Sequence, residues 1–343
     1  MDAAWIAASF VISAAGTAAA IGYARARRMV DLPGQRRSHT VPTLRGGGIG
    51  IVLAAAFALW NYFGAREMAL LHLVGLGLVA GVGWWDDHRP LRASFRLAVH
   101  FLAALALVAP YIVFALSWLE GAPEETRKLA ILALIGGSLL GAVWSINLHN
   151  FIDGINGLLA LQSVWFFTMV GLLGPLMAVH PGWLPFALAA ACLAFVPFNF
   201  PRARVFMGDV GSGAIGFLMF AMIWGGWTNQ PGEPRWLALG LILASAPAID
   251  ATATLLARML AGRRWYSAHR EHLYQWLVRS GRSHARVVGY YMAWNLFIAA
   301  PASLIVARSP RLDVAAGVTA LVYAAGLAAW CASRRAVLEG ARR

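Results

Sequence analysis

The stretch Ser145–Leu158, with the sequence SINLHNFIDGINGL, ends a long apolar segment with a dense group of polar residues. The amides of Asn150 and Asn156 and the carboxylate of Asp153 are costly beside hydrocarbon unless each finds a partner. Two glycines in the stretch permit a tight turn and the close approach of a ligand to the backbone. The stretch predicts either a polar connection between two membrane helices, capped by Asn and Asp, or a functional site.

The composition places the chain in a membrane. Of its 343 residues, 60% are apolar and only 13% are charged, whereas soluble domains are about half apolar and a quarter charged. We expect no cleavable signal peptide, because Asp2 precedes the first apolar run and arginines follow it. Cys192 and Cys331 both lie in apolar runs, so neither a disulfide nor a metal site is expected from them.

Apolar runs recur along the chain, and spanning a bilayer takes roughly 20 residues. We predict an all-α polytopic membrane protein in which residues 1–343 form a single integral membrane domain with eleven transmembrane helices. The predicted spans are 3–24, 46–63, 68–85, 95–117, 129–148, 157–174, 183–198, 211–228, 236–257, 287–307 and 313–333.

The basic residues divide the connecting loops into two groups. Loops that follow odd-numbered spans hold most of the 28 basic residues. The other loops hold only Arg66, Arg127, Lys128, Arg235, Arg308 and Arg311. Because cytoplasmic loops collect Lys and Arg, we predict that the N-terminus lies outside and the C-terminus lies in the cytoplasm. This placement explains the net charge of +13, so no nucleic-acid partner is expected.

Acidic motifs occur on the same predicted side. Asp86 and Asp87 adjoin at the end of the third span, and such neighbours repel unless a cation or a proton lies between them. Asp153 follows the fifth span, and Asp209, in the sequence FMGD, follows the seventh. Each acid alone could be a solvated loop residue or a helix cap. Four at one face, near arginine-rich loops, favour a site for phosphates and a divalent cation, with Mg²⁺ fitting oxygen ligands best.

The predicted loops with these motifs cover about residues 25–45, 86–95, 147–156, 199–210 and 258–286. The last is the longest hydrophilic loop, and its sequence His269-Arg270-Glu271-His272 is typical of an anion clamp. The chain has neither a Walker-type Gly-Lys loop nor a nucleotide-binding domain, so ATP-driven work is not expected.

Taken together, NLHNFIDGINGL, VFMGDVGSGAIGF, the WWDD pair and DLPGQRRSHTVPTLRGGG resemble the motifs of the polyprenyl-phosphate N-acetylhexosamine-1-phosphate transferases, glycosyltransferase family 4. The resemblance covers about residues 31–275. It implies a multi-helix enzyme of the bacterial cytoplasmic (inner) membrane, often a homodimer, with its active site facing the cytoplasm. Such an enzyme moves a sugar-1-phosphate from a UDP-sugar onto undecaprenyl phosphate, a membrane lipid, and releases UMP. The implied cofactor is Mg²⁺, with Mn²⁺ as the alternative ion.

The resemblance also implies residue roles. Asp209 matches the main Mg²⁺ ligand, and Asn150 matches an asparagine beside that metal. Asp86 matches the acid proposed to deprotonate the lipid phosphate, and Asp87 matches its neighbour, so with Asp153 and Asp209 they are the expected catalytic acids. Residues around the uridine are matched by Asp153, Asn156, Asn199 and Phe206. A basic segment is matched by Arg36, Arg37, His39 and Arg45, and the loop that contacts pyrophosphate and sugar by His269, Arg270 and His272.

Two departures from the translocase branch of the family bear on the sugar. That branch, which uses a MurNAc-pentapeptide substrate, has an Asp in place of Asn156 and three histidines in place of the His269–His272 sequence. Both differences argue against a MurNAc-pentapeptide substrate. The form HREHLYQ, with few insertions elsewhere, resembles enzymes that start O-antigen or other surface glycans from UDP-GlcNAc or a 6-deoxy relative. The expected mechanism is a single in-line displacement, and a covalent aspartyl intermediate ranks second.

Asp250, in APAIDATAT, is the one acid predicted well inside a span. It leaves an ion-coupled secondary transporter as the alternative function, because intramembrane acids often mark ion paths. It could equally hydrogen-bond Thr252, Thr254 or a neighbouring helix, and we favour this structural role. A transporter would carry its acids near the midplane, whereas four acids here are predicted at one face.

Overall fold

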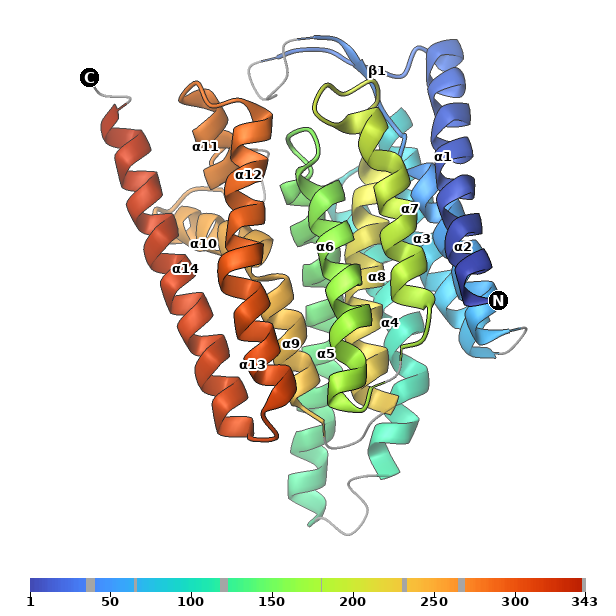
Figure 1. Ribbon diagram of the computed structural model, residues 1–343, viewed down its shortest axis with the longest axis vertical. Helices are drawn as coiled ribbons and strands as arrows, with labels where there is room; N and C mark the ends of the chain where they lie inside the picture. Colours follow the sequence, from blue (N-terminus) through green and yellow to red (C-terminus); the bar gives the residue numbers. More distant parts are fainter. Residues whose placement is uncertain are drawn as a thin grey trace.

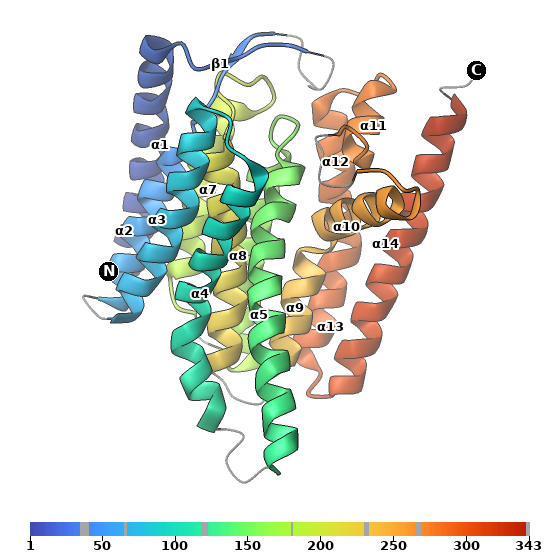
Figure 2. The same cartoon turned by 180° about the vertical axis from the view of Figure 1, so that it is seen from behind.

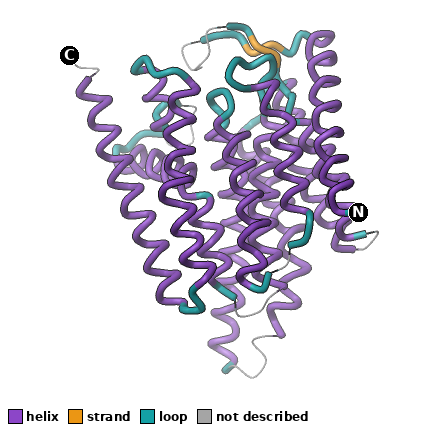
Figure 3. Tube along the Cα trace, in the orientation of Figure 1, coloured by secondary structure: helices purple, strands orange, loops and turns teal. Residues whose placement is uncertain are grey.

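Helices make up nearly all of the computed structural model, which describes residues 1–34, 41–64, 67–117, 123–179, 181–229, 233–264 and 269–340. Figure 3 shows one small pair of strands at one end of the helical bundle. The elements are α1 (Asp2–Arg27), β1 (Val30–Asp31), β2 (Thr43–Leu44), α2 (Ile49–Phe63), α3 (Glu67–His88), α4 (Ala93–Ser117), α5 (Glu124–Ile152), α6 (Leu158–Leu173), the 3₁₀ helix η1 (Gly174–Met177), α7 (Leu184–Asn199), α8 (Asp209–Asn229), α9 (Arg235–Leu243), α10 (Ser245–Leu260), α11 (Leu273–Arg279), α12 (His284–Trp294), the π-helix η2 (Asn295–Ala299), α13 (Ala300–Arg308) and α14 (Leu312–Gly340).

The long apolar helices confirm an all-α polytopic membrane fold. Within the described residues, eight helices are long and apolar enough to cross a membrane, or up to nine if the bent pair α9 and α10 is one span. The helices α2 and α7 occupy two further predicted spans but are shorter. Each predicted span therefore has a helical counterpart, while the number of crossings and their orientation stay predictions.

The ninth predicted span, residues 236–257, is not a single straight helix, which corrects the sequence prediction. It is divided into α9 and α10, which are bent by 76°. Pro247 has no N–H with which to continue the helical ladder to the carbonyl oxygen of Leu243. That oxygen instead accepts hydrogen bonds from Gln162 Nε2 (3.1 Å) and Trp165 Nε1 (3.3 Å). Side chains of α6 thus satisfy the broken backbone, as an apolar environment requires.

The helix α8 occupies the centre of the bundle (Figures 1 and 2). It packs against α2, α3, α4, α5, α6 and α9. Of the candidate spans it has the largest buried share, and its Phe217 is a fully buried part of the main apolar core. Because Asp209 is the first residue of α8, the packing of this helix fixes where that acid lies.

The loops predicted to carry chemistry lie together at one end of the bundle. The β1–β2 hairpin, the α5–α6 turn, the α7–α8 loop and α11 are all at this end (Figure 1). The hairpin pairs Val30 with Leu44, and Leu44 also bridges Val205 of the α7–α8 loop. Segments far apart in the sequence therefore meet in one layer above the helices.

The arginine distribution predicts which loops a membrane-impermeant thiol reagent reaches. In a variant without Cys192 and Cys331, a cysteine introduced at Lys128 should be labelled in intact cells. A cysteine at Arg28 or Arg282 should be labelled only after the membrane is opened, because both positions lie in arginine-rich loops. Labelling of all three positions from the outside would contradict the predicted topology.

Candidate active site

Asp87 joins three segments at the loop-bearing end of the bundle. It is 4% exposed, near the end of α3, and its carboxylate accepts hydrogen bonds from Arg45 Nε (3.1 Å) and Nη2 (2.7 Å). It also accepts from the backbone N–H groups of Asp209 (3.1 Å) and Val210 (3.2 Å), which begin α8. A helix leaves such N–H groups unpaired at its start. Asp87 therefore fixes the β2 end and the α8 start relative to α3.

Gly208 makes this contact sterically accessible. Its φ of +79° lies in the left-handed region, and a Cβ built on it would lie 2.4 Å from Asp87 Oδ2. Both the backbone conformation and the space exclude a side chain at this position. The sequence FMGD thus needs its glycine in order to bring Asp209 into the site.

Arg96 lies between two further acids. Its Nη1 donates to Asp86 Oδ2 (3.0 Å) and to Asp209 Oδ2 (2.7 Å), and Asp86 Oδ1 also accepts from the backbone N–H of Leu91 (2.7 Å). One guanidinium therefore offsets charge on the carboxylates of α3 and α8. Arg96 was not among the predicted site residues. Its place in the first turn of α4, just after an acidic pair, is the signal that could have identified it.

Asp153, which follows the end of α5, lies close enough to Asp209 and Asp87 for their charges to shift its pKa. Desolvation raises the pKa of its carboxyl well above the usual range, and the charges of Asp209 and Asp87 raise this pKa further. Like charges at short range act in this way. The structure thus brings together the four predicted acids, Asp86, Asp87, Asp153 and Asp209, from three separate parts of the chain.

Two asparagines tie the α5–α6 turn to the α7–α8 loop. Asn199 is 4% exposed; its Oδ1 accepts from the backbone N–H of Gly157 (2.6 Å), and its Nδ2 donates to the carbonyl of Val205 (3.0 Å). Asn156 Nδ2 donates to the carbonyl of Pro201 (3.1 Å). Both ends of the Asn199 amide therefore already bond the backbone. Asn199, which was predicted to lie near the uridine, thus shapes the turn.

Phe206, the remaining residue predicted near the uridine, lies in the same loop. Its backbone N–H donates to the carbonyl of Leu44 (2.7 Å), which places it beside the hairpin that leads to Arg45. The predicted basic residues Arg36, Arg37 and His39 lie outside the described residues.

The acid cluster suits a divalent cation by charge and by donor type. Asn150 is partly exposed near the end of α5, about one turn before Asp153. Among the described residues, no group of three or more His, Cys, Asp or Glu side chains is arranged to hold a metal ion. Mg²⁺ commonly keeps several waters and binds through one or two carboxylates and substrate phosphates, so an open set of oxygen donors fits it. Desolvation and, after it, the charges of Asp209 and Asp87 raise the Asp153 pKa, and a bound cation would offset the repulsion among these acids.

The predicted anion clamp leads directly into α11. Glu271 pairs with Arg258 and with Arg263 (3.0 Å), which holds the segment against the end of α10. His272 is 3% exposed, and its ring stacks on that of Phe151 with 6.0 Å between centroids. The clamp therefore lies beside the α5 end that carries Asn150.

Burial lowers the pKa of both histidines of this segment. Desolvation, with the nearby His272 and Arg258, lowers the pKa of His269 to about 4. Desolvation also lowers the pKa of His272. The positive charge that this segment offers to an anion is therefore that of Arg270, with the imidazoles as neutral hydrogen-bonding groups.

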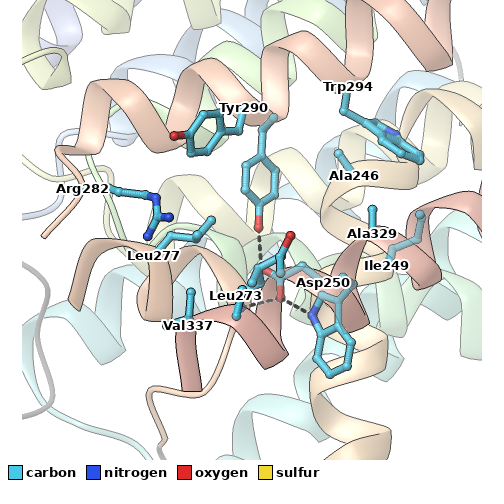
Figure 4. Close-up of a pocket in the computed structure, with 15 residues that line it drawn as sticks. Ala246, Ile249, Asp250, Leu273, Leu277, Arg282, Tyr290, Trp294, Ala329 and Val337 are labelled. Atoms are coloured by element: carbon cyan, nitrogen blue, oxygen red, sulfur yellow. Dashed lines mark hydrogen bonds between the residues drawn. The ribbon is translucent and has the colours of Figure 1, made fainter. Parts of the chain in front are cut away.

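In the described part of the chain, hollows also lie outside the acid cluster itself. One of about 530 Å³ is open and borders the cluster at Trp85, Leu91, Arg92, Ser94 and Phe95. The other, about 420 Å³, lies between α10, α11, α12 and α14, with mostly apolar walls that include Asp250 (Figure 4).

The fold and the site define a class first: a polytopic helical membrane protein whose acids and arginines from distant segments meet at one end. Comparison with known proteins then defines the family. The sequence profile of glycosyl transferase family 4 matches residues 68–226, a range that includes all four acids.

Full-length relatives extend the match. The chain is 29% identical over 332 residues to the decaprenyl-phosphate N-acetylglucosaminephosphotransferase of Mycobacterium tuberculosis, covering 87% of this chain and 81% of that protein. It is 30% identical over 315 residues to the protein of the same name from Mycobacterium leprae, covering 82% and 78%. The undecaprenyl-phosphate alpha-N-acetylglucosaminyl 1-phosphate transferase of Escherichia coli K12 is 27% identical over 270 residues, covering 74% and 70%. The chain belongs to glycosyl transferase family 4, which confirms the resemblance drawn from the motifs.

Replacing Asp87 should show how much its hydrogen bonds stabilise the fold. Asp87→Asn should lower the free energy of unfolding by about 3 kcal/mol, because Arg45 and two helix N–H groups lose a buried acceptor. Asp86→Asn is the matched control and should cost less than about 1 kcal/mol, because its carboxylate is partly exposed and bonds no helix start. Thermal unfolding in detergent measures both; equal losses would show that Asp87 is not the anchor.

The raised pKa of Asp153 predicts a pH-dependent stability. A carboxyl that binds its proton more tightly when folded destabilises the fold as the pH rises above the unfolded value of about 3.9. Asp153→Asn should therefore raise the Tm of the metal-free protein at about pH 7.5, and the gain should shrink toward about pH 5. The exposed, ion-paired Asp313 supplies the control, since Asp313→Asn should give no gain. A lower Tm for Asp153→Asn at the higher pH would refute this reading.

Proposed function

We propose that the protein transfers an N-acetylhexosamine 1-phosphate from a UDP-sugar to a polyprenyl phosphate and releases UMP. The observation that carries the proposal is the cluster of four acids with Arg45 and Arg96, in a family 4 chain whose relatives are named for this reaction. Those names support UDP-GlcNAc as the donor, and the E. coli relative supports undecaprenyl phosphate as the acceptor. The arginine-rich loops support a site on the cytoplasmic face of a bacterial inner membrane. The first step of a surface glycan is the role that fits this reaction.

The acceptor lipid is proposed to approach along the open hollow between α3 and α4. Trp85 and Phe95 are 55% and 46% exposed there, which provides apolar contacts for a prenyl chain. Arg92 also borders this hollow and provides a cation for the phosphate. Asp86 Oδ1 accepts from the backbone N–H of Leu91, which lines this hollow, and its carboxylate can accept or orient the proton of the lipid phosphate.

The donor nucleotide is proposed to bind where the α5–α6 turn meets the α7–α8 loop. Phe206 offers a ring for stacking on uracil, and Asn156 offers an amide for hydrogen bonds to its edge. Asp153 lies at the same turn. Asn199 shapes this pocket through the backbone that it holds.

The proposed reaction is one in-line displacement at the β-phosphorus. An oxygen of the lipid phosphate forms the new P–O bond, and the bond to the UMP oxygen breaks. Asp209 and Asn150 would hold Mg²⁺, or Mn²⁺ as the alternative, which neutralises diphosphate charge when bound. Arg270, with His269 and His272, offsets charge on the phosphoryl oxygens. A covalent aspartyl intermediate ranks second, because Asp209 cannot easily be both the metal ligand and the nucleophile.

The purified protein in detergent should release UMP from UDP-GlcNAc only when undecaprenyl phosphate and a divalent cation are both present. Asp209→Asn should lower turnover by about 1000-fold, because charge stabilisation is the main source of rate in phosphoryl transfer. The control Asp313→Asn should retain activity. UMP release without lipid, or uptake of a solute by proteoliposomes without UMP release, would contradict the proposal.

A further inference from the structure

Asp250 is a buried acid that the proposed reaction leaves unexplained. It is 2% exposed in α10. Its Oδ1 accepts from Leu273 N (2.7 Å), Trp330 Nε1 (3.1 Å) and Thr254 Oγ1 (3.3 Å). The bond to Thr254 matches one of the structural roles expected from the sequence. A buried carboxylate that receives this many donors is held in one place.

The other oxygen extends the same arrangement. Oδ2 accepts from the hydroxyl of Tyr291 (2.6 Å) and from the backbone N–H of Tyr274 (3.3 Å). Figure 4 shows Asp250 at the centre of the cavity wall, bonded to side chains from α12 and α14. Since Leu273 and Tyr274 are the first residues of α11, Asp250 holds the start of that helix against α10. The His269–His272 segment immediately before it is thereby positioned.

Tyr274 links the start of α11 to the α5–α6 turn beside the acid cluster. Its hydroxyl donates to the carbonyl of Phe151 (2.8 Å). A Cβ added to Gly154 would lie 2.0 Å from the same hydroxyl, so the tyrosine lies directly against the turn that carries Asp153. The ring of His272 stacks on that of Tyr274, with 5.8 Å between centroids. Tyr274 therefore contacts both the basic segment His269–His272 and the turn that carries Asp153.

We propose that Asp250 is a positioning residue that sets the basic segment His269–His272 against the Asn150–Asp153 turn. This proposal rests on the proposed function, which assigns the basic segment to the phosphoryl oxygens and the turn to the cation and the nucleotide. Asp250 touches neither substrate; it acts through the start of α11 and through Tyr274. A misplacement of about 1 Å at a reacting group can cost about 100-fold in rate, so such support has catalytic consequences.

The chemistry of the donors explains why this position needs a carboxylate. All five donors are neutral, and two are backbone N–H groups that cannot accept a hydrogen bond. An ionised carboxylate only accepts, at about four lone-pair sites. Asparagine of the same shape would turn an N–H₂ group toward at least one of these donors, leaving buried groups unpaired.

The test uses the full-length enzyme in detergent, with UDP-GlcNAc and undecaprenyl phosphate as the probes. Asp250→Asn should raise the KM for UDP-GlcNAc and lower kcat/KM by about 100-fold, with the KM for the lipid unchanged. Hydrogen–deuterium exchange should rise at the Leu273 and Tyr274 amides and stay unchanged in α8. Asp250→Glu keeps the acceptor chemistry but moves the oxygens; it should show the same pattern and serves if the amide variant does not fold.

Thr254→Val is the matched control. It removes a donor to the same oxygen from the same helix but leaves both α11 bonds, so both KM values should stay at wild-type level. Tyr274→Phe should reproduce part of the Asp250→Asn effect on UDP-GlcNAc. Wild-type kinetics in Asp250→Asn, or equal changes in both KM values with faster exchange throughout the protein, would overturn the proposal. Absence of UMP release by the wild-type enzyme would instead refute the proposed function.

Discussion

A buried carboxylate that caps a helix other than its own is the constraint on which the site depends. Asp87 of α3 accepts from Arg45 and from the first two N–H groups of α8, and Gly208 leaves room for it. Because α8 is the central helix of the bundle, this contact holds the loops above it against the packed core. Asp209 then faces Arg96 at the surface of a packed support, where preorganised charge is most effective. The Asp87 contact thus supports the site, while Asp86 and Asp209 are the acids proposed to act on the lipid phosphate and the cation.

The same device recurs in the C-terminal part of the chain. Asp250 of α10 caps the start of α11 much as Asp87 caps α8. One acid thereby places the acidic loops and the other places the basic segment, and Tyr274 joins the two. The break between α9 and α10 belongs to this arrangement, since it turns α10 across the bundle (Figure 2), and α10 carries the carboxylate that accepts from the start of α11.

Hydropathy and motif spacing predicted the positions of the helices and the meeting of the four acids, because both depend on local patterns and on the alternation of spans. The break near Leu243 was not predicted: hydropathy does not register the N–H group that Pro247 lacks. Arg96 was not predicted as a site residue, because its contact with an acid 113 residues away depends on tertiary packing. The partners of Asp250, such as Trp330 some 80 residues further on, are equally invisible to a single sequence.

The central claim is that acids from separate hairpins form one cation site beside the place where the diphosphate binds. Anomalous X-ray scattering from crystals of the enzyme grown with Mn²⁺ and UDP tests it most directly. The account predicts a single strong peak within bonding distance of the Asp209 carboxylate, on the side that faces Asn150 and Asp153. A peak at another face of the molecule, or UDP bound away from this cluster, would contradict it.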